Sequence, residues 1–235
     1  HETPGSSLSA SRLETFFTCP YRYFLRYVAG LRPEPEQRRY ALAAAEGGRL
    51  YHAILKRCFE RLKRESLLPL DPENTDAVLG VLEEEAGGFM GWYGREVWAG
   101  HPAYWASLTP QVLARLKEYL LRELHAPTSE AVPERFEQAF RLELEGLLEG
   151  RIDRVDVSAG QKAVHLVDYK TGSRREHKAD SWGGGRNLQL PIYLLWARHE
   201  FPDAQRITGA YEYIFAGKKI AFEPEPWDKT RATMA

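Results

Sequence analysis

The sequence predicts a mixed α/β (α+β) fold, in which a mainly helical first half precedes a central mixed sheet flanked by helices. Two patterns lead to this prediction. From Glu46 to Leu67, apolar residues recur at helical spacing and form one stripe between basic faces. From Pro133 onward, apolar and charged residues alternate instead, which is typical of strands with one buried face. The order helices, strands, helix, strands favours a sheet with helices packed against it.

The individual elements follow from spacing and from breaker residues. Helices are expected over 9–28 with an interruption at Pro20, over 46–67, over 73–98 and over 110–125. Strands are expected near 140–145, over 147–157 and over 163–170, followed by a glycine-rich basic loop at 171–186. A helix over 187–201 and strands over 207–215 and 219–222 complete the prediction.

The length and composition indicate one domain. The chain has 235 residues, of which 43% are hydrophobic and 28% charged, enough for one sizeable core. Residues 1–8 are interpreted as a tag or linker, 9–130 as the helical part and 131–225 as the sheet core of a single domain, 9–235. Because the chain starts at His1 with a tag-like stretch, we interpret it as a piece of a longer protein.

Charge and cysteine content limit the possible partners and compartment. A net charge of −1 means that any nucleic-acid binding needs locally clustered Lys and Arg. No apolar run approaches the roughly 20 residues of a membrane span, and no signal pattern opens the chain, so no membrane is expected. The two cysteines, Cys19 and Cys58, exclude a disulfide framework and a zinc site of several thiolates. A reducing cytoplasm is the expected location.

Two carboxylates and a lysine form the most informative constellation. Asp168 and Lys170 share one strand face, and a hairpin partner can bring Asp153 beside them. Adjacent carboxylates repel unless a cation lies between them, and hard oxygen ligands suit Mg²⁺ or Mn²⁺. The alternative is an exposed cross-strand ion pair of Asp168 with Lys170. Because Val164 and Leu166 share the Asp168 face, the two charges end a buried strand, which favours a site.

These segments resemble the PD-(D/E)XK nuclease superfamily, and within it the RecB-like and AddB-like branch that also includes CRISPR-associated exonucleases. The resemblance covers most of the chain, and the order and spacing of its motifs agree throughout. The motifs are Leu8-Ser-Ala-Ser-Arg-Leu13 with Cys19-Pro-Tyr21, Gly48-Arg-Leu-Tyr-His52, Gly150-Arg-Ile-Asp-Arg-Val-Asp156, Asp168-Tyr-Lys-Thr-Gly172 and Gln189-Leu-Pro-Ile-Tyr193.

The resemblance implies a restriction-endonuclease-like core and a role for each matched residue. Lys170 would orient or deprotonate the attacking water and offset charge on the scissile phosphate. Gln189 and Tyr193, four residues apart on one helical face, would point at the site or at the DNA beside it. The implied ligands of Mg²⁺ or Mn²⁺ are His52, Asp153, Asp168 and the backbone carbonyl of Tyr169.

Several of these residues also have simpler interpretations. His52 fits a helical histidine satisfied by a nearby carbonyl or water, and Tyr193 fits a core position beside Leu190 and Leu194. Glu137 is a candidate for an acidic residue that precedes the first acidic motif in this branch. Asp156 faces away from Asp153 on a regular strand, so it is interpreted as structural and paired with Arg154 or another basic residue.

Two further features concern DNA and an iron–sulfur cluster. The basic loop offers DNA contacts to phosphates or bases, although a solvated loop without a partner is an equal alternative; its candidates are Arg174, Arg175, Lys178 and Trp182. Many members of the branch hold a four-cysteine cluster, and Cys19 matches its first ligand. No cysteine follows Cys58, so this chain alone cannot close such a cluster.

The resemblance therefore implies a Mg²⁺-dependent deoxyribonuclease, the exonuclease module of a helicase–nuclease in double-strand-break repair, in a bacterial or archaeal cytoplasm. Its expected partners are single-stranded DNA or duplex ends, and helicase domains or subunits of a larger protein. One alternative is a catalytically inactive nuclease-like domain that binds DNA or serves as a scaffold; the intact residue set counts against it. Another is a hydrolase of RNA, which a comparison of DNA and RNA cleavage separates.

Overall fold

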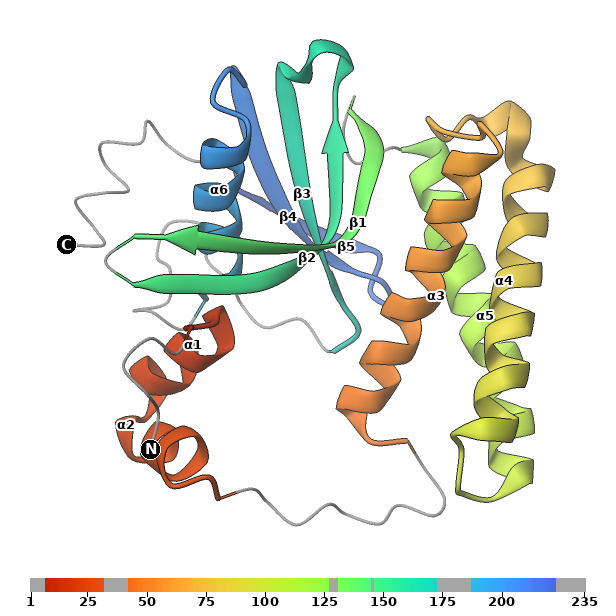
Figure 1. Ribbon diagram of the computed structural model, residues 1–235. Coiled ribbons are helices and arrows are strands. Elements are labelled where there is room, and N and C mark those ends of the chain that lie inside the picture. The colour runs from red at the N-terminus through yellow and green to blue at the C-terminus, as the bar shows by residue number, and fades with distance from the viewer. Residues whose placement is uncertain (1–6, 32–41, 127–130, 145, 173–186, 223–235) are drawn as a thin grey trace.

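A five-stranded mixed sheet lies beside three long helices in the computed structural model (Figure 1). The structure describes residues 7–31, 42–126, 131–144, 146–172 and 187–222. The strands follow one another in space in chain order, β1-β2-β3-β4-β5. Among the paired strands that the structure describes, β3 and β4 are parallel and the other pairs are antiparallel; the helix α6 (Gln189–Glu200) lies between β3 and β4 in the chain, as a parallel connection requires. The strands are β1 (Val132–Glu143), β2 (Leu147–Val157), β3 (Ala163–Lys170), β4 (Arg206–Tyr213) and β5 (Lys218–Phe222).

The helices cover the two faces of the sheet unequally. The long helices α3 (Ala44–Arg64), α4 (Thr75–Glu96) and α5 (Pro102–His125) form one layer, which packs on one face through a large apolar core. On the other face α6 packs against β3 and β4, and α1 (Ala10–Thr18) contacts α6 and β2. Next to α1 lie α2 (Pro20–Tyr23) and a π-helical turn, Phe24–Val28; two short 3₁₀ helices are Pro72–Asn74 and Ala159–Gln161.

The strand β3 separates the two cores. Val167 and Tyr169 belong to the core shared with α3, α4 and α5, while Val164 and Leu166 belong to the core under α6. This alternation is the period of two of an extended chain. Asp168 continues the Val164 and Leu166 face, so a buried carboxylate, 3% exposed, ends an apolar strand as predicted.

The predicted order of elements is confirmed, and the bounds differ most for one helix and one strand. The helix expected from Pro110 begins at Pro102 and contains Pro110 in its interior. Its first turns are anchored by Trp105, whose ring stacks on Tyr93 and whose indole N–H donates to the carbonyl of Met90 at 3.1 Å. Tertiary packing therefore outweighs the loss of one backbone hydrogen bond at the internal proline.

The first strand is also longer than expected. It begins at Val132, whereas the alternation in the sequence is clear only from Phe140 onward. A register shift between Pro133 and Arg135 and a positive φ of 50° at Glu137 interrupt the regular period. A bulge changes which face later residues point to, so the period of two is hidden in the sequence.

The amino-terminal boundary differs as well. Leu8 falls within the predicted tag or linker at 1–8, but its N–H donates to the carbonyl of Leu147 at 2.7 Å. Its carbonyl accepts from the N–H of Glu149 at 2.9 Å, so Leu8 is a short extension of the sheet. Within the described ranges, no helix has both the length and the apolar character that crossing a membrane requires.

Candidate active site

A fork between β2 and β3 creates the site. The pairing of β2 with β3 starts at Arg154 opposite Val167 and continues only toward Val157. On the other side of Arg154, the β1–β2 hairpin bends away from β3 (Figure 1). The N–H of Tyr169, the next residue of β3 to face β2, donates to Asp153 Oδ2 at 2.7 Å instead of to a strand partner. The fork thus frees the carbonyl of Tyr169 for other contacts.

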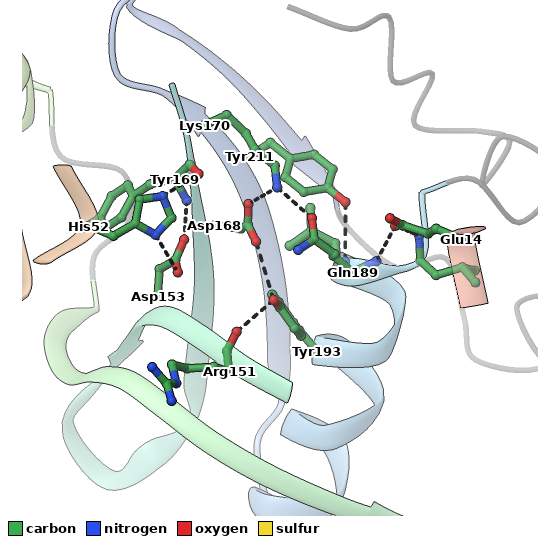
Figure 2. Close-up of polar contacts among 12 residues, drawn as sticks. Glu14, His52, Arg151, Asp153, Asp168, Tyr169, Lys170, Gln189, Tyr193 and Tyr211 are labelled. Atoms are coloured by element: carbon green, nitrogen blue, oxygen red, sulfur yellow. Dashed lines mark hydrogen bonds and ion pairs between the residues drawn. The ribbon is translucent and has the colours of Figure 1, made fainter. Parts of the chain in front are cut away.

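His52 reaches this fork from the helix α3. Its Nδ1 lies 3.1 Å from Asp153 Oδ1 and its Nε2 lies 3.1 Å from the carbonyl oxygen of Tyr169 (Figure 2). One turn earlier, a Cβ on Gly48 would lie 3.3 Å from Thr171 Oγ1. A glycine at this position therefore lets α3 approach the end of β3 closely enough for His52 to reach the site.

The electrostatics of the fork indicate an excess of negative charge. Burial and the neighbouring carboxylate of Asp168 raise the pKa of Asp153 to about 6. Burial lowers the pKa of His52, but the carboxylates of Asp153, Asp168 and Glu137 outweigh it and raise that pKa above its ordinary value. Both ring nitrogens of His52 face oxygen acceptors, an arrangement that a protonated ring or a bound cation satisfies.

Glu137 joins the group from β1. The ligand atoms of His52, Glu137 and Asp153 all lie within 4.8 Å of one another. Glu137 lies between Phe136 and Gln138, which pair with residues on either side of Asp153, and its Oε2 is 3.4 Å from Arg151 Nη1. The predicted ligand set differs in one respect, since Asp168 is absent from this compact group.

Asp168 is turned toward Lys170 instead. The Lys170 ammonium contacts Asp168 Oδ2 and donates to Gln189 Oε1 at 2.6 Å (Figure 2). The same ammonium lies 4.9 Å from the centre of the Tyr211 ring. Burial lowers the pKa of Lys170, but the carboxylates of Asp168, Asp153 and Glu14 together outweigh this effect and raise it above its ordinary value. Lys170 is thus held as a cation between a carboxylate, an amide oxygen and an aromatic face.

Tyr193 combines both roles considered for it. Its ring is buried, 4% exposed, and packs edge-on against Phe140 at 5.8 Å between centroids. Its hydroxyl donates to the carbonyl of Arg151 at 2.8 Å and lies 3.5 Å from Asp168 Oδ1. Tyr193 therefore connects α6 to β2 directly beside the predicted site.

The site opens into a cleft of about 1340 Å³ between α3, the β1–β2 hairpin and the end of β3. Three carboxylates line it: Glu137, Glu149 and Asp153. Basic side chains also line it, from α3, β1, β2 and the end of β3: Arg49, Lys56, Arg141, Arg151 and Lys170. The basic side chains suit a polyanion, and the carboxylates among them suit a cation bound between the protein and that polyanion.

Four predicted DNA contacts, Arg174, Arg175, Lys178 and Trp182, lie outside the described residues. Cys19 follows α1 with its thiol partly exposed, and Cys58 is buried on α3. These are the two cysteines of the chain, which therefore does not fit a four-cysteine iron–sulfur cluster by itself.

The sequence prediction missed three nearby residues that the structure brings to the site: Glu14, Arg151 and Tyr211. Glu14 lies 174 residues from its partner Leu188, so no local spacing reveals the contact. Arg151 accepts from Tyr193 through its backbone carbonyl, which any residue supplies, and its guanidinium pairs with Glu137 across the hairpin. Tyr211 is a buried residue of β4, and the sequence does not distinguish it from an aromatic residue of the core.

A separate polar cluster lies on the opposite face of β2. Arg154, 1% exposed, donates to both oxygens of Asp156 at 2.8 and 2.9 Å and to Glu123 at 3.0 Å. It also donates to the hydroxyls of Tyr119 at 3.2 Å and Tyr169 at 3.4 Å. The predicted pairing of Asp156 with Arg154 is confirmed. Tyr169 thus has its side chain in this cluster and its backbone in the fork.

The comparison with known families decides the relationship. The model of the PD-(D/E)XK nuclease superfamily matches residues 7–232. The chain belongs to this superfamily. The resemblance inferred from the motifs is therefore confirmed.

Individual relatives agree with this assignment. An ATP-dependent helicase/deoxyribonuclease subunit of Moorella thermoacetica is 32% identical over 221 residues, which are 83% of this chain and 18% of the relative. The identically named protein of Symbiobacterium thermophilum is 30% identical, covering 80% of this chain and 17% of the relative. The chain thus spans less than a fifth of these relatives. The crystal structure of SSO0001 matches at 16% identity over 77% of this chain and 68% of its own, with a TM-score of 0.27.

Proposed function

We propose that this chain is a Mg²⁺-dependent DNA nuclease domain, the exonuclease module of a larger helicase–nuclease that acts in double-strand-break repair. The observation that carries the proposal is the fork, where His52 contacts Asp153 and the Tyr169 carbonyl beside the pair of Asp168 with Lys170, next to a cleft with basic walls. Relatives named as helicase/deoxyribonuclease subunits support DNA as substrate, with the motor in other parts of the longer protein.

The residues fit a hard divalent cation. Asp153 and Asp168 belong to neighbouring strands at the fork, and burial together with the charge of Asp168 raises the pKa of Asp153. Carboxylate and carbonyl oxygens with one imidazole suit Mg²⁺ or Mn²⁺ better than a soft metal. His52, Asp153, Asp168 and the Tyr169 carbonyl would hold the ion, and Glu137 would complete the acidic shell. When bound, the ion supplies Lewis acidity and lowers the pKa of a nearby water.

The protein's own groups then orient the reactants. An ammonium has three N–H donors, and Lys170 directs two of them at Asp168 and Gln189. The third remains for the attacking water or a phosphate oxygen, where the positive charge stabilises the developing negative charge. Tyr193 holds the Arg151 backbone next to Asp153.

The proposal is tested by incubating the chain with linear single-stranded and duplex DNA, and with RNA, in Mg²⁺, Mn²⁺ or EDTA. We expect metal-dependent degradation of DNA that disappears in Asp168→Ala. If RNA were cleaved as fast as DNA, the substrate would be nucleic acid in general and not DNA alone. Absence of cleavage together with tight metal-independent DNA binding would favour the inactive scaffold instead.

A further inference from the structure

The start of the helix α6 lies directly at the predicted catalytic lysine. Gln189, the first residue of α6, accepts a hydrogen bond from Lys170 through its side-chain oxygen. The first residues of a helix have backbone N–H groups without partners inside the helix and fray most readily. The residue before α6, Leu188, gives no side-chain hydrogen bond to the helix, and its first turn has no acidic residue. The helix therefore lacks a cap of its own.

Glu14 of the helix α1 supplies this cap from a distant part of the chain. Its Oε1 accepts from the backbone N–H of Leu188 at 2.7 Å and from that of Gln189 at 3.3 Å (Figure 2). A carboxylate at this place satisfies two free donors and interacts favourably with the positive end of the helix dipole. The contact is partly buried, so solvent competes with it less than at an open surface.

The helix that presents Glu14 is itself anchored to the sheet. Leu8 pairs with β2, and the Ser9 hydroxyl caps the start of α1 by accepting from the N–H of Arg12 at 3.4 Å. The helix α1 is therefore anchored to β2 at its start, and its residue Glu14 contacts the start of α6. A contact chain runs from Glu14 through the Gln189 backbone and side chain to the Lys170 ammonium.

We propose that Glu14 is a positioning residue of the nuclease site: by capping α6 it fixes Gln189, and Gln189 fixes Lys170. The inference rests on the proposed function, because its consequence is a rate of phosphodiester cleavage. Glu14 does not touch the substrate in this assignment. If Glu14 only held α1 against α6, its loss would affect stability. A positioning role requires instead that its effect on the rate depend on Gln189.

The first test compares Glu14→Ala and Glu14→Gln with a matched control, Glu84→Ala, which removes an exposed glutamate of α4 that pairs with Arg61. We measure kcat and KM for a single-stranded oligonucleotide at saturating Mg²⁺. Loss of a helix cap changes the equilibrium between the formed and the frayed helix start by about tenfold. Glu14→Ala should lower kcat by roughly that factor with KM within about twofold. Glu14→Gln, which retains an acceptor oxygen, should recover part of the loss, and the control should equal the wild type.

The deciding test is a double-mutant cycle with Gln189→Ala. If Glu14 acts through Gln189, the double variant should cleave no more slowly than Gln189→Ala alone. An equal loss from Glu14→Ala in both backgrounds would overturn the proposal, as would a lowered Tm with unchanged kcat.

A readout without activity separates this inference from the proposed function. Hydrogen exchange at the Leu188 and Gln189 amides should accelerate in Glu14→Ala and stay unchanged in Glu84→Ala. The ¹⁵N resonance of the Lys170 ammonium should shift in the first variant alone. If the wild type cleaves no DNA, the proposed function fails, but the two signals still test whether Glu14 caps α6 and positions Lys170. Unchanged hydrogen exchange or an unchanged Lys170 resonance in Glu14→Ala would refute that role.

Discussion

Asp153 and Arg154 are neighbours in the chain, yet they belong to two polar regions of opposite character on the two faces of β2. Arg154 lies at the centre of a closed cluster, where its donors meet Asp156, Glu123 and Tyr119 and almost no surface reaches solvent. Asp153 lines an open cleft, and burial together with the carboxylate of Asp168 raises its pKa. The closed cluster satisfies its charges internally, whereas the open one has acidic charge that an external cation would balance.

The comparison teaches how to distinguish structural from chemical polar groups in this fold. Burial alone does not separate them, because Asp156 and Asp168 are 1% and 3% exposed. The separating property is whether the donors and acceptors are used up within the protein. Glu123, Asp156 and Arg154 use theirs on one another, while the fork retains oxygens that face a cleft.

The largest expected effect is on turnover at the open face. Lys170→Ala should lower single-turnover cleavage by about 10²–10³-fold, because it removes the charge that stabilises the transition state. Metal binding, measured by Mn²⁺ titration, should be retained. Asp168→Ala should lose both cleavage and metal affinity. Near-normal cleavage by Lys170→Ala would contradict the assigned role.

Substitutions in the closed Arg154 cluster should lower the unfolding free energy more than substitutions at the open site do. Arg154→Met removes the guanidinium that pairs with the buried carboxylates of Asp156 and Glu123, which should cost about 3–5 kcal/mol of unfolding free energy. Asp153→Asn should change that free energy by no more than about 1 kcal/mol, because the loss of the His52 ion pair is offset by relief from Asp168. Urea unfolding of both variants without metal measures the contrast. Equal destabilisation would remove the distinction between the faces.

Metal should act on the open face alone. At a concentration about 100 times its Kd, a divalent ion should stabilise the folded chain by about 2.7 kcal/mol. His52→Ala and Asp153→Asn should lose most of this increment, and Glu137→Gln a smaller part. Thermal melting with and without Mn²⁺ provides the measurement, with Glu84→Ala as control. A full increment in Asp153→Asn would place the ion elsewhere.

The smallest effect is expected at the cleft walls. Arg49→Ala and Lys56→Ala should each weaken DNA binding with little dependence on sequence, and each should reduce the salt slope by about 1. Arg57, which lies on the same helix but outside the cleft lining and pairs with Glu85, supplies the control. Binding to labelled oligonucleotides in EDTA, over a range of salt, tests this. Unchanged slopes would show that DNA takes another path.

Much of this site was predictable because its residues follow one another along neighbouring elements. Asp153 and the Tyr169 amide are 16 residues apart, and Lys170 and Gln189 are 19 apart. Strand periodicity places Asp168 and Lys170 on one face, strand pairing can bring Asp153 beside them, and the helical period places Gln189 with Tyr193. Only the resemblance to the nuclease superfamily singled out His52, since a lone helical histidine has many uses.

The remaining features depend on geometry that the sequence does not encode locally. Glu137 faces the site because of a bulge and a positive φ, which single-residue patterns do not reveal. Glu14 meets α6 only after α1 has packed beside it. Arg154 follows directly after the motif aspartate, and only its neighbours on α5 identify it as the centre of a buried cluster.

The sequence distances within the fork also bear on how the chain folds. His52 is 101 residues from Asp153 and 117 from Tyr169, while the strand and α6 components lie within short stretches of one another. Closing a long loop costs more conformational entropy than closing a short one, so we expect the sheet and Lys170 to reach native geometry before His52 does. On this expectation, docking of α3 is the step that completes the group of proposed metal ligands.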